Sequence, residues 1–295
     1  MELLQCLSPH APFWRPDPSV WVFRGHANDD WKLLASAHRD NAFDAYVLPE
    51  KIRSSQTEWI RRSESELWLL KKFSEGLGSA GLSIPIHAPT IERGNETSFG
   101  GEPNRDAWPL RGLAQHHGLP TALLDWTGRA RNAAYFAAAE GAVDRSDSGH
   151  LAVWALRTDL LRYVTRDSFE AEPVVGLPIT SSGYHCWLRL VRIAYANNPN
   201  MHAQSGLFTS TVGEYVLAVD KFILKLVHSE TERLSKAPPT LQPPFMWRFS
   251  LPTVEAPRLL RLLSYEGVTG AAMFPGCDGV AKALREQGLW DEPPT

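Results

Sequence analysis

The chain has 295 residues, of which 43% are hydrophobic and 21% charged, and its formal net charge is -3. This composition supports a packed core and excludes a disordered chain. The small negative charge excludes a general attraction to nucleic acid, although it leaves room for a local basic groove. No apolar run reaches the about 18 residues of a membrane-spanning helix, and the start of the chain lacks the pattern of a secretory signal.

Three cysteines lie far apart in the sequence, at Cys6, Cys186 and Cys277. Such a sparse, odd set predicts neither a disulfide framework nor a structural zinc site, and it favours a reducing, cytoplasmic location. The pair His116-His117 predicts no metal site either, because adjacent residues do not share a helix face and no further ligand follows at helical spacing.

Residues 1–19 are interpreted as an N-terminal lead-in, and residues 20–295 as a single domain. The first strand is predicted at 20–23, because β-branched and aromatic residues there are followed by Arg24-Gly25. Ser63 to Glu66 has the pattern of a capping box and predicts the start of a helix. Residues 82–107 are rich in proline, glycine and polar residues, so we expect a long loop that either is mobile or folds over the site as a lid.

The second half of the chain mixes helices and strands without a regular βαβ alternation. The sequence predicts an alanine-rich helix at 129–140, a strand at 151–156, a loop at 196–205, a long amphipathic helix at 213–235, a stiff proline-rich connector at 237–244, a strand at 245–251 and helices at 255–265 and 279–288. The predicted fold class is therefore α+β.

The most distinctive segment runs from Gln115 to Thr127. A helix is expected to end at Gly118, and two leucines enter the core before Asp125. A polar residue between an apolar strand and a helix is typical of a helix N-cap, here Asp125 or Thr127, which contributes about 1 kcal/mol. The same position also suits a residue of a functional site, and both interpretations stay open.

Arg24 follows a buried strand and stands beside a glycine that allows a ligand or another backbone to approach closely. This arrangement is typical of planar anion recognition. The alternative is an ion pair between Arg24 and a buried carboxylate, with Asp125 as the obvious partner. Because both residues follow strands, we expect Arg24 and Asp125 to lie in one cleft.

Two further segments are less distinctive taken alone. Gln204 enters a short predicted strand after a loop. Phe274 to Gly279 reads as a turn in which Asp278 could cap the following helix.

Taken together, four segments of the chain resemble the FRG domain, a bacterial and phage family named for its first motif. They are Phe23-Arg24-Gly25, the block from Gln115 to Thr127 with Ala133 to Ala137, Gln204 to Phe208, and Phe274 to Gly279. The resemblance spans roughly residues 20–288. It implies a mixed or split β-sheet core of the ADP-ribosyltransferase-like type with surrounding helices.

The resemblance further implies an NAD-dependent ADP-ribosyltransferase, an enzyme of the glycosyltransferase class, with NAD as substrate and no metal. It would be a toxin or phage-defence effector that modifies a protein or RNA acceptor, with an antitoxin or other neutralising partner and no membrane association. The alternatives are a non-catalytic nucleotide- or partner-binding module and an NAD glycohydrolase.

The resemblance implies catalytic roles for Arg24, Asp125 and Gln204. Gln204 stands where ADP-ribosyltransferases usually carry a glutamate. Either Gln204 suffices, or Asp125 or Asp278 supplies the carboxylate, or the chain binds without catalysing. The residues expected to bind NAD are Arg24, Gly25, His117, Trp126, Thr127 and Tyr135, with the Trp126 or Tyr135 ring stacking on nicotinamide.

Overall fold

The computed structural model describes residues 2–14, 17–55, 57–83, 108–144, 149–164, 174–178, 185–193, 198–213 and 216–290. Most of the loop predicted at 82–107 lies outside these ranges, so its role as a lid stays a prediction.

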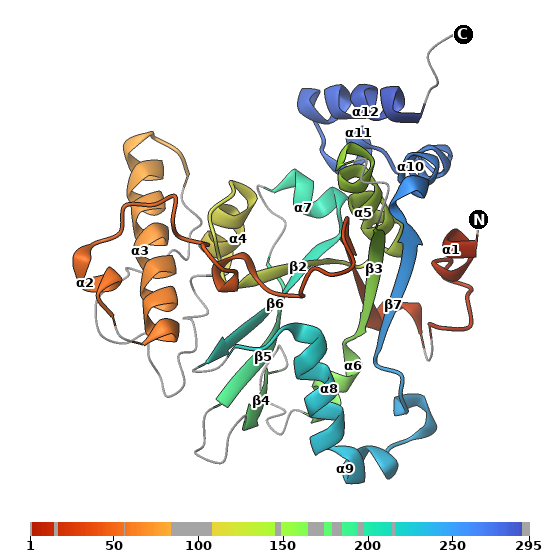
Figure 1. The fold of residues 1–295 in the computed structure, drawn as a ribbon, viewed down its shortest axis with the longest axis horizontal. Coiled ribbons are helices and arrows are strands. Elements are labelled where there is room, and N and C mark those ends of the chain that lie inside the picture. Colours follow the sequence, from red (N-terminus) through yellow and green to blue (C-terminus); the bar gives the residue numbers. More distant parts are fainter. Residues whose placement is uncertain are drawn as a thin grey trace.

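One sheet of seven strands forms the centre of the protein (Figure 1). The strands are β1 (Trp21–His26), β2 (Leu123–Thr127), β3 (His150–Arg157), β4 (Val174–Pro178), β5 (His185–Val191), β6 (Gly206–Gly213) and β7 (Met246–Pro252). Their order is β4-β5-β6-β2-β1-β3-β7, and every pairing between these described strands is antiparallel. The α+β class is confirmed, and of the two expected kinds of sheet the mixed one is not found.

The sheet is nearly divided between β1 and β2. These strands pair at one position, Phe23 opposite Thr127, whereas β1 pairs with β3 from Trp21 to His26 and β2 pairs with β6 along its whole length. In Figure 1, β2 runs across the direction of β3 and β7. The halves β4-β5-β6-β2 and β1-β3-β7 therefore diverge from a single contact, which is the geometry of a split sheet.

Helices surround the two halves of the sheet (Figure 1). They are α1 (Glu2–Cys6), α2 (Glu50–Arg53), α3 (Glu58–Ser79), α4 (Trp108–His116), α5 (Ala130–Asp144), α6 (Asp159–Val164), α7 (Pro199–Ala203), α8 (Val219–Ser229), α9 (Thr231–Ser235), α10 (Ala256–Tyr265), α11 (Gly270–Met273) and α12 (Cys277–Trp290). The alanine-rich α5 packs directly on β1 and β3, and α10 and α12 pack on α5.

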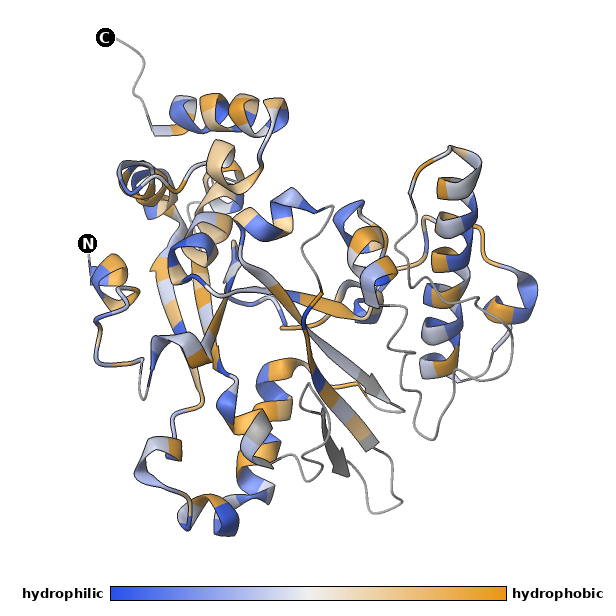
Figure 2. Cartoon of the chain, turned by 180° about the vertical axis from the view of Figure 1, so that it is seen from behind, coloured by the Kyte–Doolittle hydropathy of each residue, from blue (hydrophilic) through white to orange (hydrophobic). Residues whose placement is uncertain are grey.

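Two main hydrophobic clusters cover opposite faces of β1. Val22 packs with Trp126 and with Phe222 of α8, while Phe23 packs with α5 and α10 on the other face. Leu7 and Trp14, from the segment interpreted as a lead-in, are buried in this second cluster. Figure 2 shows the apolar residues concentrated in the central strands, with polar and apolar residues alternating along the outer helices.

The predicted capping box is wrong. The helix begins at Glu58, so Ser63 and Glu66, the two ends of the box, lie inside it. The Ser65 hydroxyl donates to the carbonyl of Arg61 within the helix, and the buried Glu66 carboxylate accepts hydrogen bonds from Arg111 and from the backbone of Ala122. Glu66 therefore makes tertiary contacts instead of capping a helix.

The long helix predicted at 213–235 is also wrong in its extent. β6 continues to Gly213 through its pairing with β5, and helical structure begins only at Val219. The chain leaves the α-helical region at Glu230, which separates α8 from α9. The loop predicted at 196–205 contains the short helix α7.

Candidate functional site

Arg24 lies one residue beyond the contact that joins the two half-sheets. Its Nε donates to Nε2 of His26 at 2.9 Å, and its Nη1 donates to the backbone carbonyl of Asp125 at 2.8 Å and lies 3.5 Å from Oδ2 of that residue. Within the described ranges its Nη2 makes no hydrogen bond. The structure thus places Arg24 and Asp125 together, as predicted. The Nη2 edge of the guanidinium is left to bind an anionic group.

The charge of Arg24 is only partly compensated. Burial lowers the pKa of the Arg24 guanidinium, the nearby charge of Asp125 raises it, and repulsion from Arg39 lowers it again. The Arg24 side chain nevertheless stays protonated, because the pKa of an arginine lies far above neutral pH. Two arginines close enough to repel each other favour an anion that would bind to both.

His26 is a neutral acceptor for Arg24. Burial, and then the charges of Arg24 and Arg39, lower the pKa of His26 to about 3. Its ring meets Trp31 edge to face, with ring centres 5.9 Å apart. The uncharged imidazole fixes the direction of the guanidinium without adding a competing charge.

Gly25 is required by the close approach of β1 to α5. A Cβ atom at this position would lie 2.0 Å from the carbonyl oxygen of Ala133 and 2.7 Å from the backbone nitrogen of Ala137. Both are backbone atoms and cannot swing away. Each residue of the first motif therefore has its own role: Phe23 packs in the core, Arg24 enters the cleft, and Gly25 lets the helix touch the strand.

Of the two residues expected as the helix N-cap, Asp125 lies inside β2 and caps no helix. Its Oδ2 accepts a hydrogen bond from Nε2 of Gln115 at 2.6 Å. Thr127 takes the expected place instead, because its Oγ1 accepts from the backbone of Arg129 just before α5. The same hydroxyl donates to the carbonyl of Gln204 at 2.6 Å and so ties β2 to the end of α7.

The diverging strands border a cleft with two adjoining lobes. The small lobe has a volume of about 270 Å³, just below the ~300–1,000 Å³ of ordinary ligand pockets, and the large lobe, of about 530 Å³, lies within that range. Both are lined by Arg24, Gly25 and Glu140, which therefore lie where the lobes meet. The small lobe is further lined by Phe23, Asp125, Trp126, Thr127, Phe136, Met201, Gln204, Gly206, Leu207 and Phe208, and the large lobe by His26, Asp30, Trp31, Lys32, Leu34, His38, Arg39 and Asp40.

Gln204 ends α7 and lines the small lobe with Arg24 and Asp125. Its Nε2 donates to the backbone carbonyl of Met273 at 3.1 Å. In the part of the chain that the structure describes, its side-chain oxygen accepts no hydrogen bond. The three residues predicted as catalytic thus share one lobe, and the Gln204 amide has a fixed orientation with a free acceptor.

Of the residues predicted to bind NAD, Tyr135 and His117 line neither lobe, and Trp126 lines the small lobe although its side chain is largely buried. Trp126 is 3% exposed and its indole donates to Thr209, because strand alternation turns it to the face opposite Asp125. Tyr135 is completely buried and donates to Glu286. The ring of His117 lies 6.0 Å from that of Phe73 and outside both lobes. These predictions of ring contacts are corrected accordingly.

Asp278, considered as a source of the carboxylate, is exposed in the first turn of α12 and lines neither lobe. The sequence reasoning missed Phe136 and Glu140, which lie one turn apart on α5 and both line the small lobe. Their spacing was visible, but nothing in the alanine-rich helix showed which face meets the cleft. The sequence reasoning also missed Arg39, because this residue lies outside the four segments that resemble the FRG domain.

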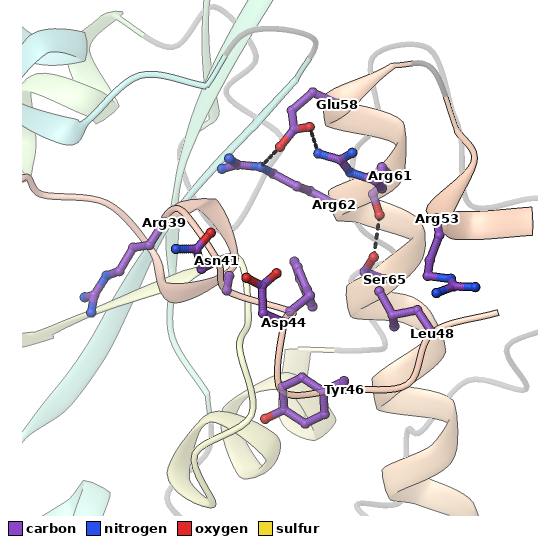
Figure 3. A pocket seen from close by; sticks show the side chains of 12 residues that line it. Arg39, Asn41, Asp44, Tyr46, Leu48, Arg53, Glu58, Arg61, Arg62 and Ser65 are labelled. Atoms are coloured by element: carbon purple, nitrogen blue, oxygen red, sulfur yellow. Dashed lines mark hydrogen bonds and ion pairs between the residues drawn. The ribbon is translucent and has the colours of Figure 1, made fainter. Parts of the chain in front are cut away.

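A third cavity, of about 430 Å³, lies beside the cleft between residues 39–48 and α3 (Figure 3). Arg39 lines this cavity and the large lobe. Arg61 and Arg62 both contact the carboxylate of Glu58 (Figure 3), and Arg62 also lies 3.8 Å from Oδ1 of Asp40, so two carboxylates face the two arginines. We assign no separate anion site here.

Comparison with known families finds a match to the FRG domain over residues 85–146. This stretch includes β2 and α5, which supply Asp125, Phe136 and Glu140 to the cleft. The resemblance inferred from the sequence is confirmed over that stretch. No curated protein and no solved structure matches the chain.

Within the described residues, no group of three histidine, cysteine or acidic side chains is placed to hold a metal ion. None of the described helices combines the length and the apolar character needed to cross a membrane.

Proposed function

We propose that this chain is an NAD-dependent ADP-ribosyltransferase that modifies a protein or RNA acceptor. The observation that carries the proposal is the position of Arg24. Its side chain is a cation at the junction of the two half-sheets, with a free Nη2, and it is shared by two lobes of unequal size. A dinucleotide has the matching form, since two nucleoside ends flank a central pyrophosphate.

The pyrophosphate would bind Arg24 through the planar, permanently charged fork that suits phosphate oxygens. Arg39, which repels Arg24 in the absence of an anion, would contribute the second charge. The nicotinamide end would enter the small lobe against the ring of Phe136, and the adenine end would enter the large lobe beside the partly exposed Trp31.

Cleavage of the bond between nicotinamide and ribose passes through a state with positive charge at the anomeric carbon, as in glycoside hydrolysis. The free side-chain oxygen of Gln204 would accept a hydrogen bond from the ribose 2′-hydroxyl. The electron pair of the broken bond leaves with nicotinamide, which departs neutral, and a nucleophilic atom of the acceptor forms the new bond. We extend the proposal to a toxin or phage-defence role with a neutralising partner.

The uncharged Gln204 favours a second candidate, a nucleotide-binding module without catalysis. Both candidates require a nucleotide to bind at Arg24, and for the transferase that nucleotide is NAD. Transfer to water instead of a macromolecule would make the chain an NAD glycohydrolase.

Calorimetric titration with NAD tests the shared requirement. We expect Arg24→Ala to weaken binding about 10- to 100-fold, since charge-assisted hydrogen bonds contribute about 1.5–3 kcal/mol. Arg258→Ala is the matched control, because Arg258 is an exposed arginine on α10. Equal affinity of the wild type and both variants would overturn the proposal.

A further inference from the structure

Glu140 is a carboxylate in the cleft that the predicted site does not include. It lies on α5 and lines both lobes where they meet at Arg24. Phe136, four residues earlier on the same helix face, lines the small lobe. The charge of Glu140 is close enough to raise the pKa of Arg24, yet Glu140 makes no hydrogen bond or ion pair within the described ranges.

Asp125 is the other carboxylate that lines the small lobe, and its Oδ2 already has two partners. Oδ2 of Asp125 accepts a hydrogen bond from Gln115 at 2.6 Å and lies 3.5 Å from Nη1 of Arg24. A carboxylate held by a cation and an amide has less charge to offer a substrate than one without a partner. Of the two carboxylates, Glu140 is therefore the better placed to stabilise positive charge on a substrate.

We propose that Glu140 is the catalytic carboxylate of the transfer, which rests on the function proposed above. In the step, the bond between C1′ of the ribose and nicotinamide breaks, and its electron pair leaves with nicotinamide. The negative charge of Glu140 stabilises the positive charge that develops at C1′. The acceptor's lone pair then forms the new bond to C1′, and Glu140 takes the proton that the acceptor releases and passes it to water.

This assignment gives Gln204 and Glu140 different tasks. The Gln204 amide, anchored to Met273, holds the ribose by a neutral hydrogen bond. Glu140 supplies the full charge that an amide lacks, and a full negative charge stabilises a developing positive charge more strongly than a neutral dipole does. A glutamate at position 204 is then unnecessary.

The test compares Glu140→Gln and Glu140→Ala with Glu232→Gln, which alters an exposed glutamate on α9. NAD affinity and single-turnover release of nicotinamide are measured for each. We expect Glu140→Gln to bind NAD normally but to release nicotinamide about 100-fold more slowly, as when a group that stabilises transition-state charge is removed. Added formate should restore part of the rate of Glu140→Ala, because it can occupy the vacated position, and Glu232→Gln should match the wild type.

Wild-type rates in Glu140→Gln, with Arg24→Ala inactive, would overturn the role of Glu140 and leave the proposed function standing. Loss of rate without any rescue by formate, together with a loss of NAD affinity, would make Glu140 a binding residue and also overturn the proposal. A wild-type protein that neither binds nor cleaves NAD would overturn the proposed function itself.

Discussion

Nη1 of Arg24 donates to the backbone carbonyl of Asp125 at 2.8 Å, although 101 positions separate the two residues in the chain. The bond crosses from β1 to β2 just beyond Phe23 and Thr127, the only positions at which these strands pair. One side chain therefore bridges the gap between the half-sheets and borders both lobes of the cleft. Anything that moves Arg24 alters the junction of the sheet and the candidate site together.

Acid should weaken the protein through His26. The pKa of His26 is about 3 in the folded protein, below its ordinary value of 6.5, so the unfolded chain binds the proton first as the pH falls. The stability that neutral His26 confers is present above pH 6.5 and is lost toward pH 3, with a slope of up to about 1.4 kcal/mol per pH unit.

Urea unfolding of the wild type and His26→Gln from about pH 7 to about pH 4 measures this effect. The wild type should lose more unfolding free energy than the variant, which cannot take up the proton. A difference between them that stays constant over this range would contradict the assignment.

Gly25→Ala should destabilise the fold and impair NAD binding. The added methyl would lie 2.0 Å from the carbonyl oxygen of Ala133, so β1 and α5 must separate. We expect a loss of at least about 1–3 kcal/mol, the usual cost of overpacking. Gly76→Ala in α3 is the control, since nothing lies near its Cβ, and it should be neutral or stabilising by about 0.5–1 kcal/mol. Similar unfolding midpoints for both variants would refute the close approach.

Tyr135→Phe should loosen the anchor of Gln204. Glu286 is 4% exposed and accepts hydrogen bonds from the Tyr135 hydroxyl and from the backbone of Gly270, at the start of α11. The last residue of α11, Met273, holds the Gln204 amide. Removing the hydroxyl leaves a buried carboxylate with fewer partners, at a cost of about 1–3 kcal/mol.

Denaturant unfolding and amide exchange of α11 would measure that loss. Tyr265→Phe provides the comparison, because this tyrosine is 74% exposed, and its unfolding free energy should change by less than about 0.5 kcal/mol. Equal effects of the two substitutions would show that the buried hydroxyl contributes nothing special.

Gln204→Glu should preserve or raise the rate of NAD cleavage, because a carboxylate beside the ribose would add to the stabilisation of positive charge. It also removes the donor to Met273, so some loss of unfolding free energy should accompany the gain. Nicotinamide release by Gln204→Glu and Gln204→Ala is the measurement. Equal rates in the two variants would reduce Gln204 to a hydrogen-bonding residue of the loop.

The sequence predicted those parts of the site in which a charged residue belongs to a recognisable strand. Arg24 and Asp125 were predicted to share a cleft because each was expected at the end of a strand, and the structure joins them although both lie inside their strands. Side chains alternate between the two faces of a strand, so Trp126 must face away from its neighbour Asp125 in β2. The sequence could therefore have shown that the Trp126 ring and the Asp125 carboxylate do not face the same side of the sheet.

Other parts of the site depend on how the helices pack on the sheet, which no short sequence motif predicts. Phe136 and Glu140 lie on a helix so rich in alanine that the side of it facing the cleft was not evident. Tyr135, on the same helix, was assigned to the ligand although its hydroxyl is used by Glu286, which lies 151 positions away. Such long-range partners are set by the tertiary fold.

The fate of NAD labelled in its adenylate part tests the central claim most directly. The protein is incubated with labelled NAD and a cell extract that supplies acceptors, alongside Arg24→Ala and Glu232→Gln. We predict that label appears on a macromolecule with the wild type and Glu232→Gln, and that Arg24→Ala abolishes it. Label recovered only as free ADP-ribose would make the chain a glycohydrolase, and unchanged NAD in every sample would contradict the account of this cleft as a site of ADP-ribosyl transfer.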